Sequence, residues 1–313
     1  MLWNKKHSEV SKHENSEIVK SNVILVAAIS IFAIGFPAAE FLLDDWDVVT
    51  VITVRNIFAF VLLFFIWIFL EGSSILRTVN WIKGFWIGGI GFGVGSFLLL
   101  FLQSLTTPVI AALAAATMPM AAVTLEVFLD GRKMTRWFVI GIILVLVGGF
   151  VATGATFSDA SFGLRLSTLL IFIPAAIFAW GSRATVKNLP GVSIVGQTTI
   201  TTFGMAGFSI VFYFVCNYLF QSIDPYPEIT LKHLGLVLIY SCFGFAISQI
   251  LWIRGVSGLG IGIASFHLNA LPFYVMFFLF LLGEIWNWQQ TIGALIVTIG
   301  VILSQIRSNR TKL

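Results

Sequence analysis

Two charged side chains lie inside long apolar stretches of this sequence. Glu40 lies near the end of one stretch and Arg55 well inside the next, although only 10% of the residues are charged and 58% are hydrophobic. A charge at mid-membrane costs about 2.5 to 3.5 kcal/mol on insertion scales, so such residues usually face a cavity or a partner. We interpret Arg55 as a binding group for an anion such as a substrate carboxylate, and Glu40 as a proton-binding group. A structural ion pair or snorkelling to the surface is the alternative.

Further candidates for contact with a solute lie in other apolar runs. His267 and Asn269 lie near the middle of the run SFHLNALPFY. Histidine titrates near neutral pH, so His267 can carry a proton or donate to a substrate oxygen. Trp180 lies deeper than an interfacial tryptophan and is a candidate for stacking on a solute, while Tyr240 and Gln249 are candidates for lining the pathway. For each of them, a buried contact between helices is the alternative.

The elements that position these residues are predicted to be membrane-spanning helices. The mean hydropathy of +0.99 and the 31 phenylalanines exceed what a soluble core needs. A spanning helix takes about 20 apolar residues, and continuous runs of that length exclude the alternating strands of a membrane barrel. We predict an all-α integral membrane protein with ten transmembrane helices. They cover 22–43, 48–70, 83–103, 107–129, 136–155, 166–187, 193–220, 232–253, 258–282 and 288–306.

The positive charges predict the direction of these helices. Fifteen of the 18 basic residues fall in the tails and in connectors on one side of the membrane, whereas the other side has only Arg165 and Lys232. Under the positive-inside rule both termini are cytoplasmic, with residues 1–21 and 307–313 as tails. We expect a multi-pass protein of the bacterial inner membrane.

The two halves of the chain repeat each other. IFAIGFPA (31–38) aligns with IFAWGSRA (177–184) at an offset of 146, and IGIILVLVG (140–148) aligns with IGALIVTIG (292–300) at an offset of 152. We therefore predict two five-helix repeats, 22–155 and 156–306. Five is an odd number, so the second repeat is inverted relative to the first. Inverted repeats are typical of alternating-access transporters.

Several of these features resemble one known family. Each half has a Trp-Gly-like pair in its first helix, Ile34-Gly35 and Trp180-Gly181, and a proline in its fourth, Pro119 and Pro272; Gly283-Glu284 precedes the last helix. This pattern resembles the ten-helix EamA-type branch of the drug/metabolite transporter (DMT) superfamily. The first half departs from it at Ile34, where the family often has Trp, and at 130–132, which read Asp-Gly-Arg instead of Gly-Glu. The resemblance implies a central cavity lined by helices 1 to 4 and 6 to 9, with helices 5 and 10 peripheral.

The sequence lacks the motifs of an enzyme or a primary pump. It contains no P-loop, no metal-ligand spacing and no GxSxG elbow, so we expect no catalytic residue, no metal and no cofactor. The basic residues are too scattered for nucleic acid. We expect a secondary active transporter that exports a small metabolite such as an amino acid, coupled to protons or exchange, with membrane lipids as neighbours, as a monomer or weak homodimer. An importer with the same fold, or a membrane sensor or scaffold that transports nothing, is the alternative.

Overall fold

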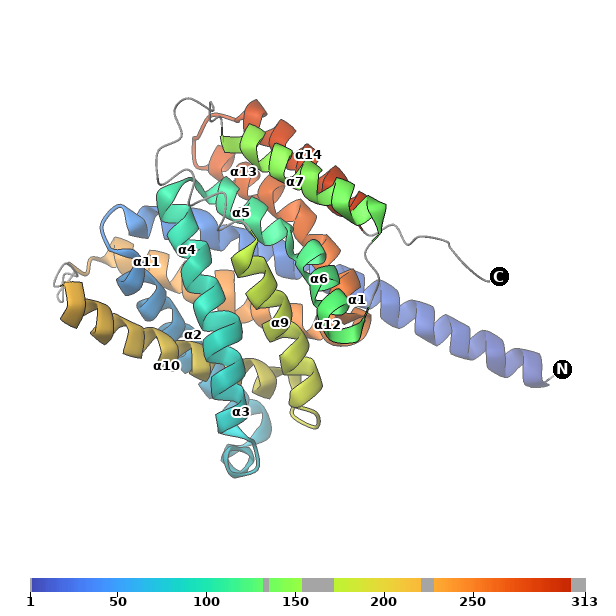
Figure 1. The fold of residues 1–313 in the computed structure, drawn as a ribbon. Coiled ribbons are helices and arrows are strands. Elements are labelled where there is room, and N and C mark those ends of the chain that lie inside the picture. The colour runs from blue at the N-terminus through green and yellow to red at the C-terminus, as the bar shows by residue number, and fades with distance from the viewer. Residues whose placement is uncertain (1, 132–134, 154–171, 221–227, 305–313) are drawn as a thin grey trace.

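A computed structural model describes residues 2–131, 135–153, 172–220 and 228–304 of the chain (Figure 1). All regular elements within these ranges are helices. The predicted boundary between the repeats at 155/156, the beginning of the sixth helix at 166, Arg165 and the tail 307–313 lie outside the described residues.

The first half runs from α1 to α7. Its elements are α1 (Leu2–Leu43), α2 (Val48–Glu71), the 3-10 turn η1 (Ser73–Arg77), α3 (Trp81–Trp86), the π-helical segment η2 (Ile87–Val94), α4 (Gly95–Leu105), α5 (Pro108–Ala116), α6 (Met118–Asp130) and α7 (Arg136–Thr153). The segments α3, η2 and α4 follow each other without a break, so Trp81–Leu105 forms one apolar span. Pro108–Leu129, from α5 and α6, forms the next.

The second half runs from α9 to α14. Its elements are α9 (Ile173–Asn188), α10 (Ile194–Phe220), α11 (Leu231–Leu238), the π-helical segment η3 (Ile239–Ile247), α12 (Ser248–Ala264), the 3-10 segment η4 (Ser265–Ala270), α13 (Leu271–Leu281) and α14 (Trp288–Ser304). The run Leu231–Leu281 is helical over 51 residues and bends at Gly260, which has a φ of 76° that favours glycine. We predicted two separate helices for this run, at 232–253 and 258–282. The bend at Gly260 lies inside the second of these ranges, near its beginning.

Seven helices within the described ranges are long and apolar enough to cross a membrane, and Trp288–Ser304 is a shorter apolar helix. One of the seven is the bent run Leu231–Leu281, and α9 begins directly after a stretch outside the described residues. The chain is therefore a helical, multi-pass membrane protein. The number of ten spans stays a prediction.

The beginnings of several helices follow from local side-chain chemistry. The Asp47 carboxylate accepts hydrogen bonds from the backbone N–H groups of Val49 and Thr50 and caps α2. Thr107 caps α5, and Pro108 occupies the first turn, where its missing N–H costs nothing. At α11, the Thr230 hydroxyl and the His233 ring accept from each other's backbone N–H groups in a capping box.

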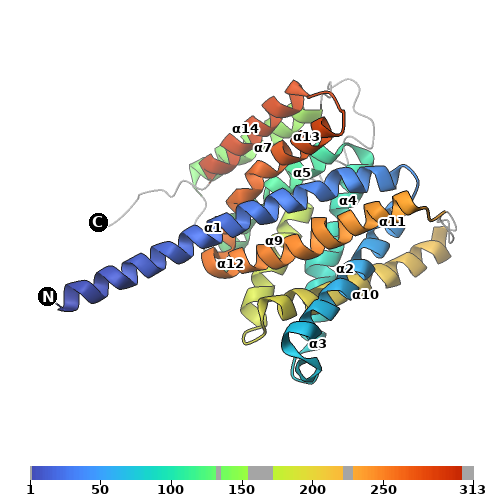
Figure 2. The same cartoon turned by 180° about the vertical axis from the view of Figure 1, so that it is seen from behind.

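The first helix of each half crosses the third helix of the other half at a pair of glycines. Gly35 in α1 meets Gly244 in η3, where a Cβ added at Gly244 would lie 2.8 Å from the Gly35 Cα. Gly181 in α9 meets Gly91 in η2, where a Cβ added at Gly91 would lie 2.5 Å from the Gly181 Cα. Gly35 and Gly181 are equivalent in the sequence repeat, so the two crossings are related by it. Figure 2 shows α1 lying alongside α11 and α12.

The two π-helical segments lie at equivalent positions of the two repeats. Ile87 at the beginning of η2 and Ile239 at the beginning of η3 are 152 residues apart, the offset that relates 140–148 to 292–300. A π-helical insertion shifts the helix face by part of a turn, and it is often found at functional sites. Its presence in both halves indicates that the third helix of each repeat has the same local register.

Helices α7 and α14 lie side by side at one edge of the molecule (Figures 1 and 2). They meet through small residues, because a Cβ added at Gly141 would lie 2.5 Å from the Gly300 carbonyl oxygen, and one at Gly148 would lie 2.8 Å from the Gly293 carbonyl oxygen. Such close backbone contact is typical of helix pairs in membranes.

The glycine crossings generate a first prediction. We expect Gly91→Ala to lower the apparent melting temperature of the purified protein by about 5 °C or more, because the new methyl group overlaps the α9 backbone. Gly235→Ala is the matched control, since a Cβ there meets nothing within 4 Å and alanine favours the interior of α11. Melting curves in detergent measure both effects. Equal melting temperatures for the two variants would contradict the role of the crossing.

Candidate functional site

A pocket lies between the two halves of the chain and is lined by residues of both. The empty space between its lining residues, counted together with the open solvent at its mouth, is about 820 Å³. Its polar lining residues are Arg55, Ser96, Gln103, Tyr240, Ser248 and Gln249. Neither α7 nor α14 contributes to the lining that the structure describes.

Arg55 is buried in the wall of this pocket, with 4% of its surface exposed. Its Nε and Nη2 donate to the Asn56 Oδ1 at 3.0 and 2.7 Å, and its Nη1 donates to the Tyr240 hydroxyl at 3.3 Å. The guanidinium carbon lies 5.1 Å from the centre of the Tyr240 ring and 4.6 Å from the centre of the Phe245 ring. Both distances are within the range of cation–π interactions.

The structure forms no salt bridge to Arg55 from any residue that it describes. Asn56 is itself fixed, because its Nδ2 donates to the Ser209 hydroxyl of α10 at 2.6 Å. The positive charge is thus held by ring faces, a hydroxyl and an amide oxygen, none of which neutralises it. An anion entering the pocket would supply the missing countercharge.

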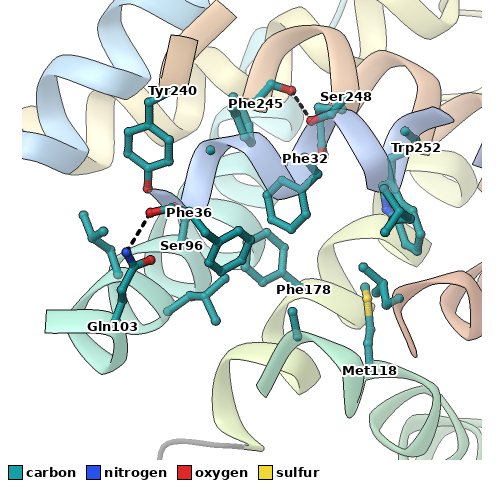
Figure 3. Close-up of a pocket in the computed structure, with 18 of the residues that line it drawn as sticks. Phe32, Phe36, Ser96, Gln103, Met118, Phe178, Tyr240, Phe245, Ser248 and Trp252 are labelled. Atoms are coloured by element: carbon teal, nitrogen blue, oxygen red, sulfur yellow. Dashed lines mark hydrogen bonds between the residues drawn. The ribbon is translucent and has the colours of Figure 1, made fainter. Parts of the chain in front are cut away.

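Gln103 connects the pocket to Glu40. The Gln103 Nε2 donates to the backbone oxygen of Phe36 and to the Glu40 Oε2, both at 2.9 Å (Figure 3 shows the first of these bonds). Gln103 lines the pocket and Glu40 does not, so the carboxylate lies one side chain behind the wall. The alternative interpretation of Glu40 and Arg55 as a structural ion pair is not found among the salt bridges of the described residues.

The middle of the pocket is aromatic. Phe32 and Phe36 of α1 meet edge to face at 5.2 Å, and Phe178 of α9 lies close to them in Figure 3. Trp252 of α12 lines the pocket too, and its indole N–H donates to the buried Ser182 hydroxyl at 3.1 Å. The lining as a whole is therefore apolar, with few polar groups placed around it.

Gln249 is another polar group of the wall. It is 8% exposed, and its Nε2 has no hydrogen-bond partner among the described residues. A buried amide without a partner pays a desolvation cost of about 1 to 3 kcal/mol. A ligand or water that accepts a hydrogen bond from Gln249 would remove that cost.

The structure brings three of the predicted site residues together and leaves four outside the pocket lining. Arg55, Tyr240 and Gln249 line the pocket, whereas Glu40 touches it only through Gln103. The other three, His267, Asn269 and Trp180, do not line the pocket and contact other parts of the protein. The His267 Nδ1 lies 3.2 Å from the Ala264 oxygen, the Asn269 Nδ2 donates to the Phe266 oxygen at 3.0 Å, and Trp180 packs on the cluster of Trp67 and Ile87.

Sequence reasoning missed the residues that continue the lining along η3 and α12. Phe245, Ser248 and Trp252, together with Gln249, recur at intervals of three, one and three residues, which places them on one helix face. This period was readable from the sequence. Tyr240 lies five residues before Phe245 and joins the same face because η3 is π-helical, and that register was not readable.

In the part of the chain that the structure describes, no group of three or more Cys, His, Asp or Glu side chains lies close enough together to hold a metal ion. The pocket chemistry therefore rests on Arg55, the amides, the hydroxyls and the aromatic rings.

A cluster of buried apolar side chains lies near the α1–α2 loop. Residues from both halves form it, and Leu100 and Tyr240 belong both to it and to the pocket lining. Its members are Ala38, Ala39, Leu42, Trp46, Val51, Ile52, Leu100, Val237 and Tyr240.

A polar contact between the halves lies next to Trp46 of this cluster. The His233 Nε2 is 2.9 Å from the Asp45 Oδ2, and the Lys232 Nζ is 3.7 Å from the same oxygen. His233 also lies against the Trp46 ring, with 5.1 Å between centroids. Because the His233 Nδ1 accepts from the Thr230 N–H, a neutral His233 carries its proton on Nε2 and donates it to Asp45.

The fold and the pocket define a class: a helical multi-pass membrane protein built from two repeats, with a pocket lined by both. The sequence profile described as the EamA-like transporter family matches the chain twice, at residues 20–154 and 166–305. The chain belongs to this family, whose members are membrane transporters. A solved structure described only as a crystal structure of a protein aligns with a TM-score of 0.61 and 18% identity, over 92% of this chain and 96% of that one, which shows the shared fold. No curated protein matches significantly.

The Asp45 contact generates a prediction about pH. The hydrogen bond from His233 lowers the pKa of the Asp45 carboxyl below its ordinary value of 3.8. A carboxyl with a lowered pKa stabilises the fold above its unfolded pKa and loses this contribution as the pH falls through its folded pKa. We expect Asp45→Ala to lower the melting temperature by about 1 to 3 °C at pH 7 and by less below pH ~3.8.

Asp44→Ala is the control for this measurement, because Asp44 is exposed and adjacent but forms no salt bridge to any described residue. Its difference from the unmodified protein should be the same at pH 7 and at pH 3.5. If Asp45→Ala also shows a constant difference, the contact with His233 does not stabilise the fold.

Proposed function

We propose that the protein is a secondary active transporter that exports a small metabolite with an anionic group, and that Arg55 binds this group. The observation that carries the proposal is a buried arginine without a countercharge in the wall of a pocket lined by both repeats. A carboxylate, as in an amino acid, matches the planar fork of the guanidinium.

The arrangement of the halves supports alternating access as the mechanism. The pocket is lined by α1, α2, α4, α5 and α6 from one half and by α9, η3, α12 and η4 from the other. If one half moves relative to the other, the pocket opens at one end and closes at the other. The glycine crossings at Gly35–Gly244 and Gly91–Gly181 lie between the halves, where a smooth contact permits such a movement.

Glu40 would couple this movement to protons, and its contact with Gln103 supports this role. While it is ionised, Glu40 accepts from Gln103, whose other contact is the backbone oxygen of Phe36. Protonation of Glu40 removes a strong acceptor and releases the Gln103 amide toward the pocket. Proton binding at Glu40 would thereby change the hydrogen bonds that the pocket offers to the solute. Coupling through exchange of two anions at Arg55 is the alternative.

A flux experiment tests the function. Proteoliposomes loaded with one unlabelled solute at a time, from a panel of amino acids and simple carboxylates, should take up the same labelled solute by counterflow. Arg55→Gln should reduce this counterflow about 10- to 100-fold, because it removes a charge-assisted hydrogen bond to the solute. Arg77→Gln is the matched control, since Arg77 is exposed in η1 and distant from the lining, and it should transport normally.

The alternatives give different outcomes in the same vesicles. Absence of counterflow for the whole panel would contradict the transporter and favour a sensor or scaffold. Comparing the two orientations of the protein separates export from import. Glu40→Gln should keep exchange and lose accumulation driven by a pH gradient; an unchanged gradient response would remove Glu40 from coupling.

A further inference from the structure

The pocket contains a single formal charge among its lining residues, and that charge is positive. Arg55 is the only lysine, arginine, aspartate or glutamate in the described lining. Glu40, the acidic residue connected to it, is separated from the pocket by Gln103, which uses its Nε2 to hold the carboxylate. A solute that touches the described wall therefore meets a cation and no anion.

The only charged hydrogen-bonding group of the described wall is a donor, and it keeps N–H groups without a partner among the described residues. Arg55 has five N–H groups, of which the described residues accept from three, so each terminal nitrogen keeps one free donor. The Nε2 of Gln249, on α12, has no partner within the described chain. A matching solute is one that accepts hydrogen bonds.

The acceptors of the wall are neutral. The Ser96 hydroxyl donates to the Gly93 oxygen, and the Ser248 hydroxyl donates to the Gly244 and Phe245 oxygens, so only their lone pairs remain for a solute. An ammonium group needs up to three acceptors and loses much of its hydration on entering an apolar pocket. Neutral hydroxyls do not compensate that loss as a carboxylate would.

The aromatic faces nearest Arg55 do not compensate an ammonium group for its lost hydration either. The Tyr240 and Phe245 rings are both within cation–π distance of the guanidinium, which already occupies them. In an α-amino acid the ammonium is attached next to the carboxylate, so binding of the carboxylate at Arg55 brings two positive charges close together. Like charges at short range in an apolar environment repel strongly.

The rest of the wall fits an apolar body. Phe32, Phe36 and Phe178 lie together in the middle of the view in Figure 3. Trp252 and the aliphatic side chains of Leu99, Leu100 and Met118 also line the pocket. Burial of an aromatic or branched aliphatic group against these residues contributes about 25 cal/mol per Å² of apolar area. The solute therefore combines one anionic end with an uncharged apolar body.

We propose, building on the proposed function, that the substrate class is hydrophobic monocarboxylates without an ammonium group, such as arylalkanoates and branched alkanoates, in preference to the corresponding amino acids. The carboxylate pairs with the free donors of Arg55, the apolar body lies among the phenylalanines, and Gln249 donates to an acceptor on the solute or to a water that accompanies it. The single buried positive charge selects against the zwitterion.

Three probes with the same phenyl group test this selection. They are 3-phenylpropanoate, L-phenylalanine and 2-phenylethylamine, which present an anion, a zwitterion and a cation. Binding to the full-length protein in detergent is measured by calorimetry at pH 7.5. We expect 3-phenylpropanoate to bind at least about 10-fold more tightly than L-phenylalanine, and the amine not to bind. Equal or tighter binding of L-phenylalanine overturns the proposal.

Variants assign the selectivity to the pocket. Arg55→Gln should abolish binding of 3-phenylpropanoate, Arg55→Lys should retain part of it, and Arg77→Gln should retain all of it. Gln249→Glu, which is close in size to the original, adds a negative charge to the wall and should shift the preference toward L-phenylalanine by about 10-fold. Unchanged preference in Gln249→Glu, with a folded protein by melting curve, also overturns the proposal.

Counterflow with the same probes separates this proposal from the proposed function. Protein-free vesicles give the passive leak of the weak acid, which is subtracted. Flux of L-phenylalanine with no binding or flux of the propanoate overturns the substrate class and supports the transporter. Tight binding of the propanoate without counterflow supports the ligand class and overturns transport of this class.

Discussion

The contact on which the pocket depends is the crossing of helices at paired glycines. At Gly35–Gly244 the backbones of α1 and η3 meet without a side chain between them, and a Cβ added at Gly35 would lie 3.2 Å from the Tyr240 ring. The crossing therefore sets where Tyr240 points, and Tyr240 in turn accepts from Arg55 and covers its guanidinium. The equivalent crossing at Gly91–Gly181 places α9 and its Phe178 against the same space. A larger residue at either crossing would separate the halves and enlarge the pocket along with them.

The electrostatics of the pocket follow from how this arginine is held. Its partners fix the plane of the guanidinium, yet they are a ring, a hydroxyl and an amide, so the position of the charge is determined while its countercharge is left open. Arg55 is therefore not part of a structural ion pair among the described residues. Glu40, by contrast, has its position set by Gln103 on the far side of the wall, where it can influence the pocket without touching a solute.

The sequence predicted the class and the repeat because these depend on composition and on residue order, and it singled out Arg55, which lies in the pocket wall. The position of Glu40 and Arg55 along the sequence does not fix the direction in which each residue faces around its helix. In the structure Glu40 faces α4 and Arg55 faces η3. His267 and Asn269 lie in η4, where 3-10 geometry changes the facing of each residue from that in an α-helix. The bend at Gly260 likewise depends on a backbone angle that residue type permits but does not dictate.

Helix α1 continues without interruption from Leu2 to Leu43, and Figures 1 and 2 show its N-terminal part projecting beyond the bundle. At 1.5 Å of rise per residue, the 33 residues between Leu2 and the crossing at Gly35 measure roughly 50 Å. A tilt of about 10° at that crossing would displace the N-terminal end by roughly 9 Å, since the helix acts as a stiff lever arm. A small movement of α1 at the pocket would thus become a larger displacement of its N-terminal end.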